Sequence, residues 1–149
     1  SKPTEDLVIE LIDPISFELN KFFYKQVGKK YQWVDRLVWE NKDWINYTSN
    51  NNLKTYVLKK KDDLVGYFEL IFNSKKNECE IAYFGILEDY FNKGFGGYML
   101  SEALKNSFKL GAKRAWVHTC SLDHPHAIQN YKSRGMKVFK TEILKRKAV

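Results

Sequence analysis

Hydrophobic and polar residues follow two periods along this chain. Strict alternation predicts a half-buried strand, and apolar residues that recur every three or four positions predict an amphipathic helix. Strands are expected over 7–12, 53–58, 64–72, 78–87, 113–119 and 136–144. Helices are expected over 14–27, 33–47, 95–110 and 125–134. This order predicts an α/β fold with a mixed sheet and helices on both of its faces, in three layers α-β-α.

Capping residues place the ends of two helices. Asp13 is a good N-cap and Pro14 suits the first position of the first helix, which Gly28 is expected to stop. The third helix, over 95–110, carries Leu100 and Leu104 on its apolar face and is expected to end at Gly111.

Length and composition bound the class of protein. A chain of 149 residues with 44% hydrophobic and 15% aromatic residues fits one folded domain over 1–149 and excludes a disordered chain. No apolar run approaches ~18 residues, so we expect no membrane span. Residues 1–6 lack the apolar core of a signal peptide. With only Cys79 and Cys120, we expect reduced thiols and a cytoplasmic protein.

The net charge of +7 is unevenly distributed. Residues 1–90 carry 13 basic and 15 acidic side chains, a net of −2. Residues 91–131 carry a net of +3 and residues 132–149 a net of +6. A basic C-terminal half indicates an anionic partner, which charge alone does not distinguish between nucleic acid and a phosphorylated cofactor.

A glycine cluster lies between the predicted strand 78–87 and the predicted helix 95–110. It reads Asn92-Lys93-Gly94-Phe95-Gly96-Gly97. Glycines allow close approach of a ligand to the backbone, and a helix start offers N–H groups to a phosphate. Met99 stands where a dinucleotide-binding fingerprint needs its third glycine, and no Gly-Lys-Ser/Thr triplet of a P-loop follows. The cluster alone is equally compatible with a turn that binds nothing.

Three landmarks in order resemble the GCN5-related N-acetyltransferase (GNAT) superfamily. The first is the strand from Glu80 to Ile86. The family's acyl-coenzyme A loop, Arg/Gln-x-x-Gly-x-Gly/Ala, maps onto residues 91–96. The family's late helix, Ala-x-x-x-Tyr-x-x-x-Gly-Phe, maps onto Ala127, Tyr131, Gly135 and Met136. The resemblance is firmest over 64–139 and implies a mostly antiparallel mixed sheet.

This resemblance implies an acyltransferase that uses acetyl-CoA as donor and an amine as acceptor, by direct transfer in a ternary complex, as a monomer or homodimer. It implies no nucleic-acid partner. The residues that it places at the cofactor are Gly85, Ile86, Phe91, Asn92, Lys93, Gly94, Phe95, Gly96, Gly97, His124, Ala127 and Tyr131. The chain departs from the family at three positions. Phe91 stands in place of the usual Arg or Gln, His124 in place of a frequent Asn, and Met136 in place of an aromatic residue.

Acyl transfer to an amine needs a base, an oxyanion site and an acid for the leaving thiolate. The resemblance implies Tyr131 as the acid and Glu80 as the first choice of base, with His118 and His124 as rivals. It also implies a bulged strand whose freed amide, near Gly85 or Ile86, holds the thioester carbonyl, and a glycine within a strand pattern favours a bulge there. Alternation puts Glu80, Ala82 and Phe84 on one face of the strand. Two alternatives are open: these apolar neighbours desolvate the Glu80 carboxylate, or Glu80 is an ordinary solvated strand residue.

The sequence is also compatible with other interpretations. Four residues of the segment 118–124 are of metal-ligand type, namely His118, Cys120, Asp123 and His124, but no zinc spacing is repeated, and we expect no metal. The acceptor region between 22 and 47 is rich in aromatic residues, most of them expected in the core, as the spacing of Trp33, Leu37 and Trp44 suggests. Asp35, Glu40 and Asp43 either meet an amine or are ordinary surface charges. A non-catalytic acyl-CoA-binding module and a nucleic-acid binder acting through 132–149 are the alternative functions.

Overall fold

A computed structural model describes residues 2–31, 33–118, 137–139 and 142–146. These residues form a seven-stranded sheet of order β1-β2-β3-β4-β5-β7-β6. Only the β4–β5 pair is parallel among the strand pairs of this described part. The strands are β1 (Leu7–Leu11), β2 (Leu53–Lys60), β3 (Asp63–Asn73), β4 (Glu78–Ile86), β5 (Arg114–His118), β6 (Lys137–Phe139) and β7 (Glu142–Arg146). The predicted mixed, mostly antiparallel sheet is confirmed.

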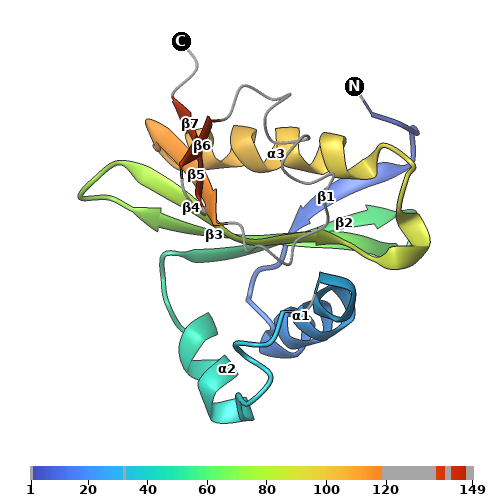
Figure 1. Cartoon of the computed structure of the whole chain (residues 1–149), viewed down its shortest axis with the longest axis horizontal. Helices are drawn as coiled ribbons and strands as arrows, with labels where there is room; N and C mark the ends of the chain where they lie inside the picture. Colours follow the sequence, from blue (N-terminus) through green and yellow to red (C-terminus); the bar gives the residue numbers. More distant parts are fainter. Residues whose placement is uncertain (1, 32, 119–136, 140–141, 147–149) are drawn as a thin grey trace.

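Helices cover both faces of this sheet (Figure 1). Helix α3 (Phe95–Lys109) lies on one face, and α1 (Phe17–Tyr31) and α2 (Asn41–Thr48) lie on the other. Buried side chains form a core on each face, because burying apolar area is the main favourable contribution to folding. The α3-side core includes Leu70, Ile81 and Leu100, and the α1-side core consists of Phe23, Val27, Val57 and Tyr67. The predicted three layers are confirmed.

Helix α1 begins later and ends later than predicted. It starts at Phe17, where the Ser16 carbonyl accepts hydrogen bonds from the amides of Leu19 and Asn20, and it continues through Gly28 to Tyr31. A Cβ on Gly28 would lie 2.9 Å from Cβ of Trp33, whose amide donates to the Gly28 carbonyl. Gly28 therefore makes room for the chain to fold back after the helix, and it does not stop the helix.

The predicted helix over 33–47 is only half right, since residues 33–40 are not helical. Helix α2 begins at Asn41 behind a capping box, in which Glu40 and Asp43 each bind the other's backbone amide. Leu37, expected in the core, is 54% exposed, whereas Trp44 is fully buried. The segment before Asn41 is held instead by its side chains, as described below.

The predicted strand over 136–144 is wrong, because the chain reverses within it. Strands β6 and β7 pair antiparallel, with Lys137 opposite Leu144 and Phe139 opposite Glu142. No Gly, Pro, Asn or Asp marks this reversal in the sequence. The predicted helix over 125–134 lies outside the described residues. No helix in the described parts of the chain is long and apolar enough to cross a membrane.

Candidate functional site

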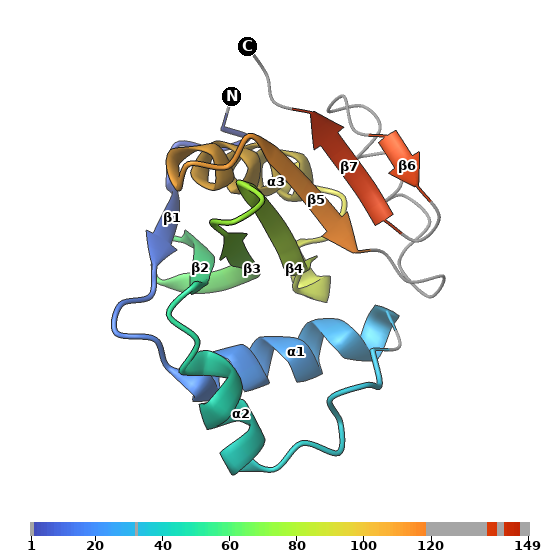
Figure 2. The same cartoon turned by 90° about the vertical axis from the view of Figure 1, so that its left-hand side faces the viewer.

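Strands β4 and β5 part halfway along β4 (Figure 2). They pair from Glu78 opposite Arg114 to Ile81 opposite Val117. Strand β4 continues to Ile86 against β3, whereas β5 continues against β7. Beyond Ile81, the backbone of β4 has no strand partner on this side within the described residues. Such an open edge can accept an extended ligand as if it were another strand.

A β-bulge stands where the two strands part. Across β3, Tyr83 is opposite Glu69 and Ile81 is opposite Leu70, so Ala82 is the additional residue. The bulge expected at Gly85 is therefore wrong, and Gly85 pairs regularly with Tyr67. A Cβ on Gly85 would lie 2.2 Å from Cγ1 of Val27, so this glycine allows α1 to approach the sheet closely.

The bulge also changes which face each side chain of β4 occupies. Phe84 packs with Cys79 and Ile81 in the α3-side core, whereas Tyr83 packs against the α1-side core. Glu80, between Cys79 and Ile81, lies on the α1 side and is half-buried. The expectation that Glu80, Ala82 and Phe84 share one face is wrong, because an additional residue inverts the alternation beyond it.

The glycine cluster forms a tight turn that leads into α3. The chain leaves β4 at the end where the strands part, passes through the 3₁₀ turn η1 (Glu88–Tyr90), and reaches Gly94, which precedes the first residue of α3. Asn92 and Gly94 have φ of 63° and 80°, in the left-handed region that favours Gly and Asn. Lys93 between them is exposed.

Phe91 has an apolar role in this turn. It is half-buried and packs against the α3-side core, as does Tyr90. A packed aromatic ring can therefore brace the turn where family members use the polar contacts of Arg or Gln.

Several predicted site residues lie outside the described residues. These are His124, Ala127 and Tyr131, together with Cys120 and Asp123 of the metal alternative. The backbone of His118 ends β5, opposite Glu142 of β7. Among the described residues, no group of three or more His, Cys, Asp or Glu side chains could hold a metal ion.

An arginine surrounded by aromatic rings, which the sequence reasoning missed, lies between α1, α2 and β4. The guanidinium carbon of Arg36 is 4.1 Å from the ring centroids of both Tyr47 and Tyr83 and 4.6 Å from that of Trp39. The rings of Tyr24 and Trp44 lie within 6 Å. Arginine stacks on aromatic faces better than lysine does. One feature of the sequence could have drawn attention to this residue: Arg36 is the single Arg among residues 1–113, where every other basic side chain is Lys.

The counter-charge of Arg36 is Glu69 of β3. Their closest side-chain atoms are 3.6 Å apart, and Glu69 is completely buried. Glu69 also accepts hydrogen bonds from the Asn20 amide (2.8 Å) and the Tyr47 hydroxyl (2.5 Å). Burial would lower the pKa of Arg36, but the Glu69 carboxylate raises it above its ordinary value. Glu69 thus ties α1, α2 and the segment between them to the sheet.

Asp35, the neighbour of Arg36, is an exposed carboxylate held by two phenols. Tyr24 donates to Oδ1 at 2.8 Å and Tyr83 donates to Oδ2 at 2.7 Å. Burial alone would raise the pKa of this carboxyl, but the two phenol hydrogen bonds hold it below its ordinary value. Because Tyr83 belongs to the part of β4 beyond its pairing with β5, Asp35 lies on the α1 side of the opening between these strands.

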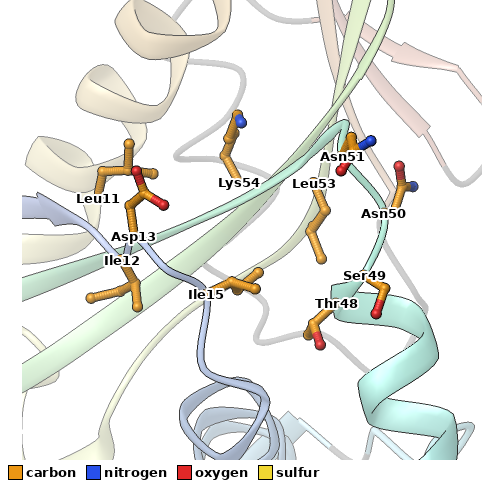
Figure 3. A pocket seen from close by; sticks show the side chains of 10 residues that line it. All are labelled: Leu11, Ile12, Asp13, Ile15, Thr48, Ser49, Asn50, Asn51, Leu53 and Lys54. Carbon is orange, nitrogen blue, oxygen red and sulfur yellow. The ribbon is translucent and has the colours of Figure 1, made fainter.

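A separate pocket lies on the β1–β2 side of the sheet (Figure 3). It has a volume of about 190 Å³ and is formed by the β1–α1 connection, the end of α2 and the start of β2. Polar residues such as Asp13, Asn50 and Lys54 line it. It shares no residue with the opening beside β4.

The sequence matches the family model described as the Acetyltransferase (GNAT) family over residues 14–136. This chain belongs to the GNAT family. The match covers most of the chain, including the opening beside β4 and the glycine turn, and it confirms the resemblance drawn from residues 64–139. The predicted enzyme class, an acyl-CoA-dependent N-acetyltransferase, is confirmed at the level of the family. A search of curated proteins gives no sequence match.

Solved structures share the GNAT fold at low sequence identity. An acetyltransferase from Bacillus subtilis in complex with CoA is 18% identical, with a TM-score of 0.71 over 95% of this chain and 99% of its own. The ribosomal-protein-S18-alanine N-acetyltransferase from Escherichia coli is 11% identical, with a TM-score of 0.75 over 96% and 95%. A dodecameric spermidine N-acetyltransferase from Vibrio cholerae is 18% identical, with a TM-score of 0.69 over 97% and 93%.

Proposed function

We propose that this GNAT chain transfers an acetyl group from acetyl-CoA to a primary amine by direct attack in a ternary complex. The observation that carries this proposal is the parting of β4 and β5 beyond Ile81, beside the glycine turn that leads into α3. Beyond Ile81, where β4 has left β5, the opening can take the amide-containing pantetheine arm of the donor as if it were another strand. The turn offers backbone N–H groups to its pyrophosphate.

The charge distribution supports the same donor. The basic half of the chain begins at Phe91, within the glycine turn, and coenzyme A carries a pyrophosphate and a 3′-phosphate. Lys93 is exposed in this turn, and Lys132 and Arg134 follow in sequence. A phosphate at a helix N-terminus gains roughly 0.3–1 kcal/mol from the helix dipole, and up to ~2 when partly buried. The CoA complex of the Bacillus subtilis structure supports this assignment, because the two chains share one fold.

The chemical roles follow from the resemblance and from the geometry of β4. The amine nitrogen attacks the thioester carbonyl, and a backbone amide of β4 beyond Ile81 stabilises the oxyanion. The resemblance puts this amide near Gly85 or Ile86, although the bulge itself lies at Ala82. When the tetrahedral intermediate collapses, the C–S bond breaks and Tyr131 protonates the leaving thiolate. Glu80 takes the amine proton, directly or through water, with His118 and His124 as the rival bases. The α1 side, to which Glu80 and Tyr83 both belong, is the side from which we expect the acceptor to enter.

Calorimetry and a thiol-release assay test this function. We expect acetyl-CoA to bind with a dissociation constant in the micromolar range, a typical enzyme scale, at moderate salt. We also expect sustained thiol release that requires an amine. Binding without turnover across a panel of amines would instead favour a non-catalytic acyl-CoA module. Absence of acetyl-CoA binding, together with salt-sensitive nucleic-acid binding that disappears when Lys145, Arg146 and Lys147 are neutralised, would favour the nucleic-acid alternative.

A further inference from the structure

The charges around the aromatic cluster leave one net negative charge, and it is exposed. Arg36 and Glu69 form a buried pair of opposite charges. Asp35 stands beside them as a second carboxylate, without a cation of its own among the ion pairs of the described residues. An exposed carboxylate that no cation pairs with directly attracts cations.

Asp35 retains capacity for a ligand. A carboxylate offers about four lone-pair positions, and the phenols of Tyr24 and Tyr83 occupy one on each oxygen. The two phenols fix the orientation of the carboxylate before any ligand arrives. The indole of Trp33 packs edge-on against the ring of Tyr83, with the two centroids 4.8 Å apart. A carboxylate held by phenols of an aromatic cluster is suited to an organic ammonium group, because the carboxylate provides the counter-charge and nearby rings can contact the cation.

The reacting amine is a poor candidate for this position. A neighbouring carboxylate favours the protonated form of an amine, and the protonated nitrogen cannot attack a thioester. Nor does Asp35 suit the role of base at neutral pH, because its pKa lies below the ordinary value of a carboxyl. Binding energy from a part of the substrate that does not react can instead position the part that does.

We propose that Asp35, held between Tyr24 and Tyr83, binds a second, non-reacting ammonium group of the acceptor, which is therefore a diamine or polyamine. This inference rests on the proposed function, since it concerns the acceptor of that same site. The exposed apolar side chains of Val34 and Leu37 lie in the same segment and can contact the hydrocarbon spacer of such an amine.

Matched amines provide the test. Diaminobutane, diaminohexane and diaminooctane are each compared with the monoamine of the same carbon number, by calorimetry with and without coenzyme A and by acetyl transfer. We expect the wild-type chain to prefer the best diamine by about ten-fold or more, the scale of a hydrogen bond to a charged group. Asp35→Asn should abolish this preference by raising the KM for diamines. The KM for monoamines, which have no second ammonium group, should change little. Asp62→Asn, in the exposed β2–β3 turn, removes the same charge elsewhere and should keep the preference.

A second variant separates recognition from folding. Asp35→Glu retains the charge at a longer reach, so it should keep the diamine preference and move it to a shorter spacer. Equal binding of diamines and monoamines to the wild type, or an undiminished preference in Asp35→Asn, would overturn the inference even if acetyl transfer is efficient. Conversely, a diamine preference that depends on Asp35 but comes without any acetyl transfer would support the inference and count against the proposed function.

Discussion

The guanidinium of Arg36 lies 3.6 Å from the carboxylate of Glu69, and 9% and 0% of the two side chains are exposed. The pair joins a segment without regular secondary structure to the middle of β3. It fixes Asp35, which immediately precedes Arg36 in the chain, beside Tyr83 of β4. The position of Asp35, on the side of β4 where we propose that the acceptor binds, therefore depends on a buried ion pair.

Glu69→Gln tests the importance of this pair for stability. Glutamine keeps the size of the side chain but leaves Arg36 buried without its counter-charge, which typically costs about 3–5 kcal/mol. Urea unfolding should show a loss of this order. Glu10→Gln is the control, because Glu10 pairs with Lys59 at the surface, where such a pair contributes about 1 kcal/mol or less. Equal losses in the two variants would contradict the assignment.

Gly85→Ala tests the close approach of α1 to β4. The added Cβ would lie 2.2 Å from Cγ1 of Val27, and overpacking of a core typically costs about 1–3 kcal/mol. In a Val27→Ala background that carbon is absent, so the same substitution should cost much less. Unfolding of the two single variants and the double variant measures this coupling. Strict additivity would show that Gly85 is required for another reason.

Local signals were sufficient to predict α3. The spacing of its apolar residues predicts the helix directly. Gly94 and Gly111, which both have positive φ, mark its two ends from nearby positions in the sequence. The spacing of apolar residues over 33–40 wrongly predicts a helix, because the structure of this segment depends on distant partners. Asp35 binds Tyr83, 48 residues away, and Arg36 pairs with Glu69. Trp33 and Arg36 are three residues apart, which fits a helix, and this spacing carries no information about partners so distant in the sequence.

The interpretation of β4 failed for a related physical reason. A glycine within a strand pattern indicates either a bulge or a close neighbour, and sequence alone does not distinguish the two. The neighbour at Gly85 is Val27 of α1, whose position follows from packing of the entire α1 face. The bulge occurs at Ala82, a residue without any backbone preference that would mark it.

Gly94→Ala tests the glycine turn as the proposed phosphate site. The φ of 80° at Gly94 costs a non-glycine residue about 1–2 kcal/mol, while the nearest atom to a new Cβ is 3.7 Å away, so the cost comes from the backbone. We expect calorimetry to show weaker coenzyme A binding for Gly94→Ala and a smaller loss for Gly94→Asn, since Asn tolerates this conformation. Gly111→Ala, with a φ of 106° at the other end of α3, should lower stability without changing that affinity. Unchanged binding by Gly94→Ala would remove this turn from the cofactor site.

Tyr131→Phe tests the proposed acid. Removal of the phenol should lower turnover by about ten-fold or more, at the lower end of general-acid contributions, while the affinity for coenzyme A holds. The assay is thiol release under saturating donor. Tyr56→Phe, which removes a phenol from the α3-side core, should leave turnover unchanged. If Tyr131→Phe behaves like this control, Tyr131 has no part in the proton transfer.

Glu80→Gln tests the proposed base through the pH dependence of kcat/KM. A base must be deprotonated to accept the amine proton, so activity should fall as the pH drops and the carboxylate becomes protonated. Glutamine cannot titrate, and the variant should show a lower rate with a flattened acidic limb. Glu78→Gln is the matched control, because Glu78 lies two residues earlier on the same strand and pairs with Arg114 before β4 and β5 part. An acidic limb that persists in Glu80→Gln but disappears in His118→Asn would transfer the role to His118.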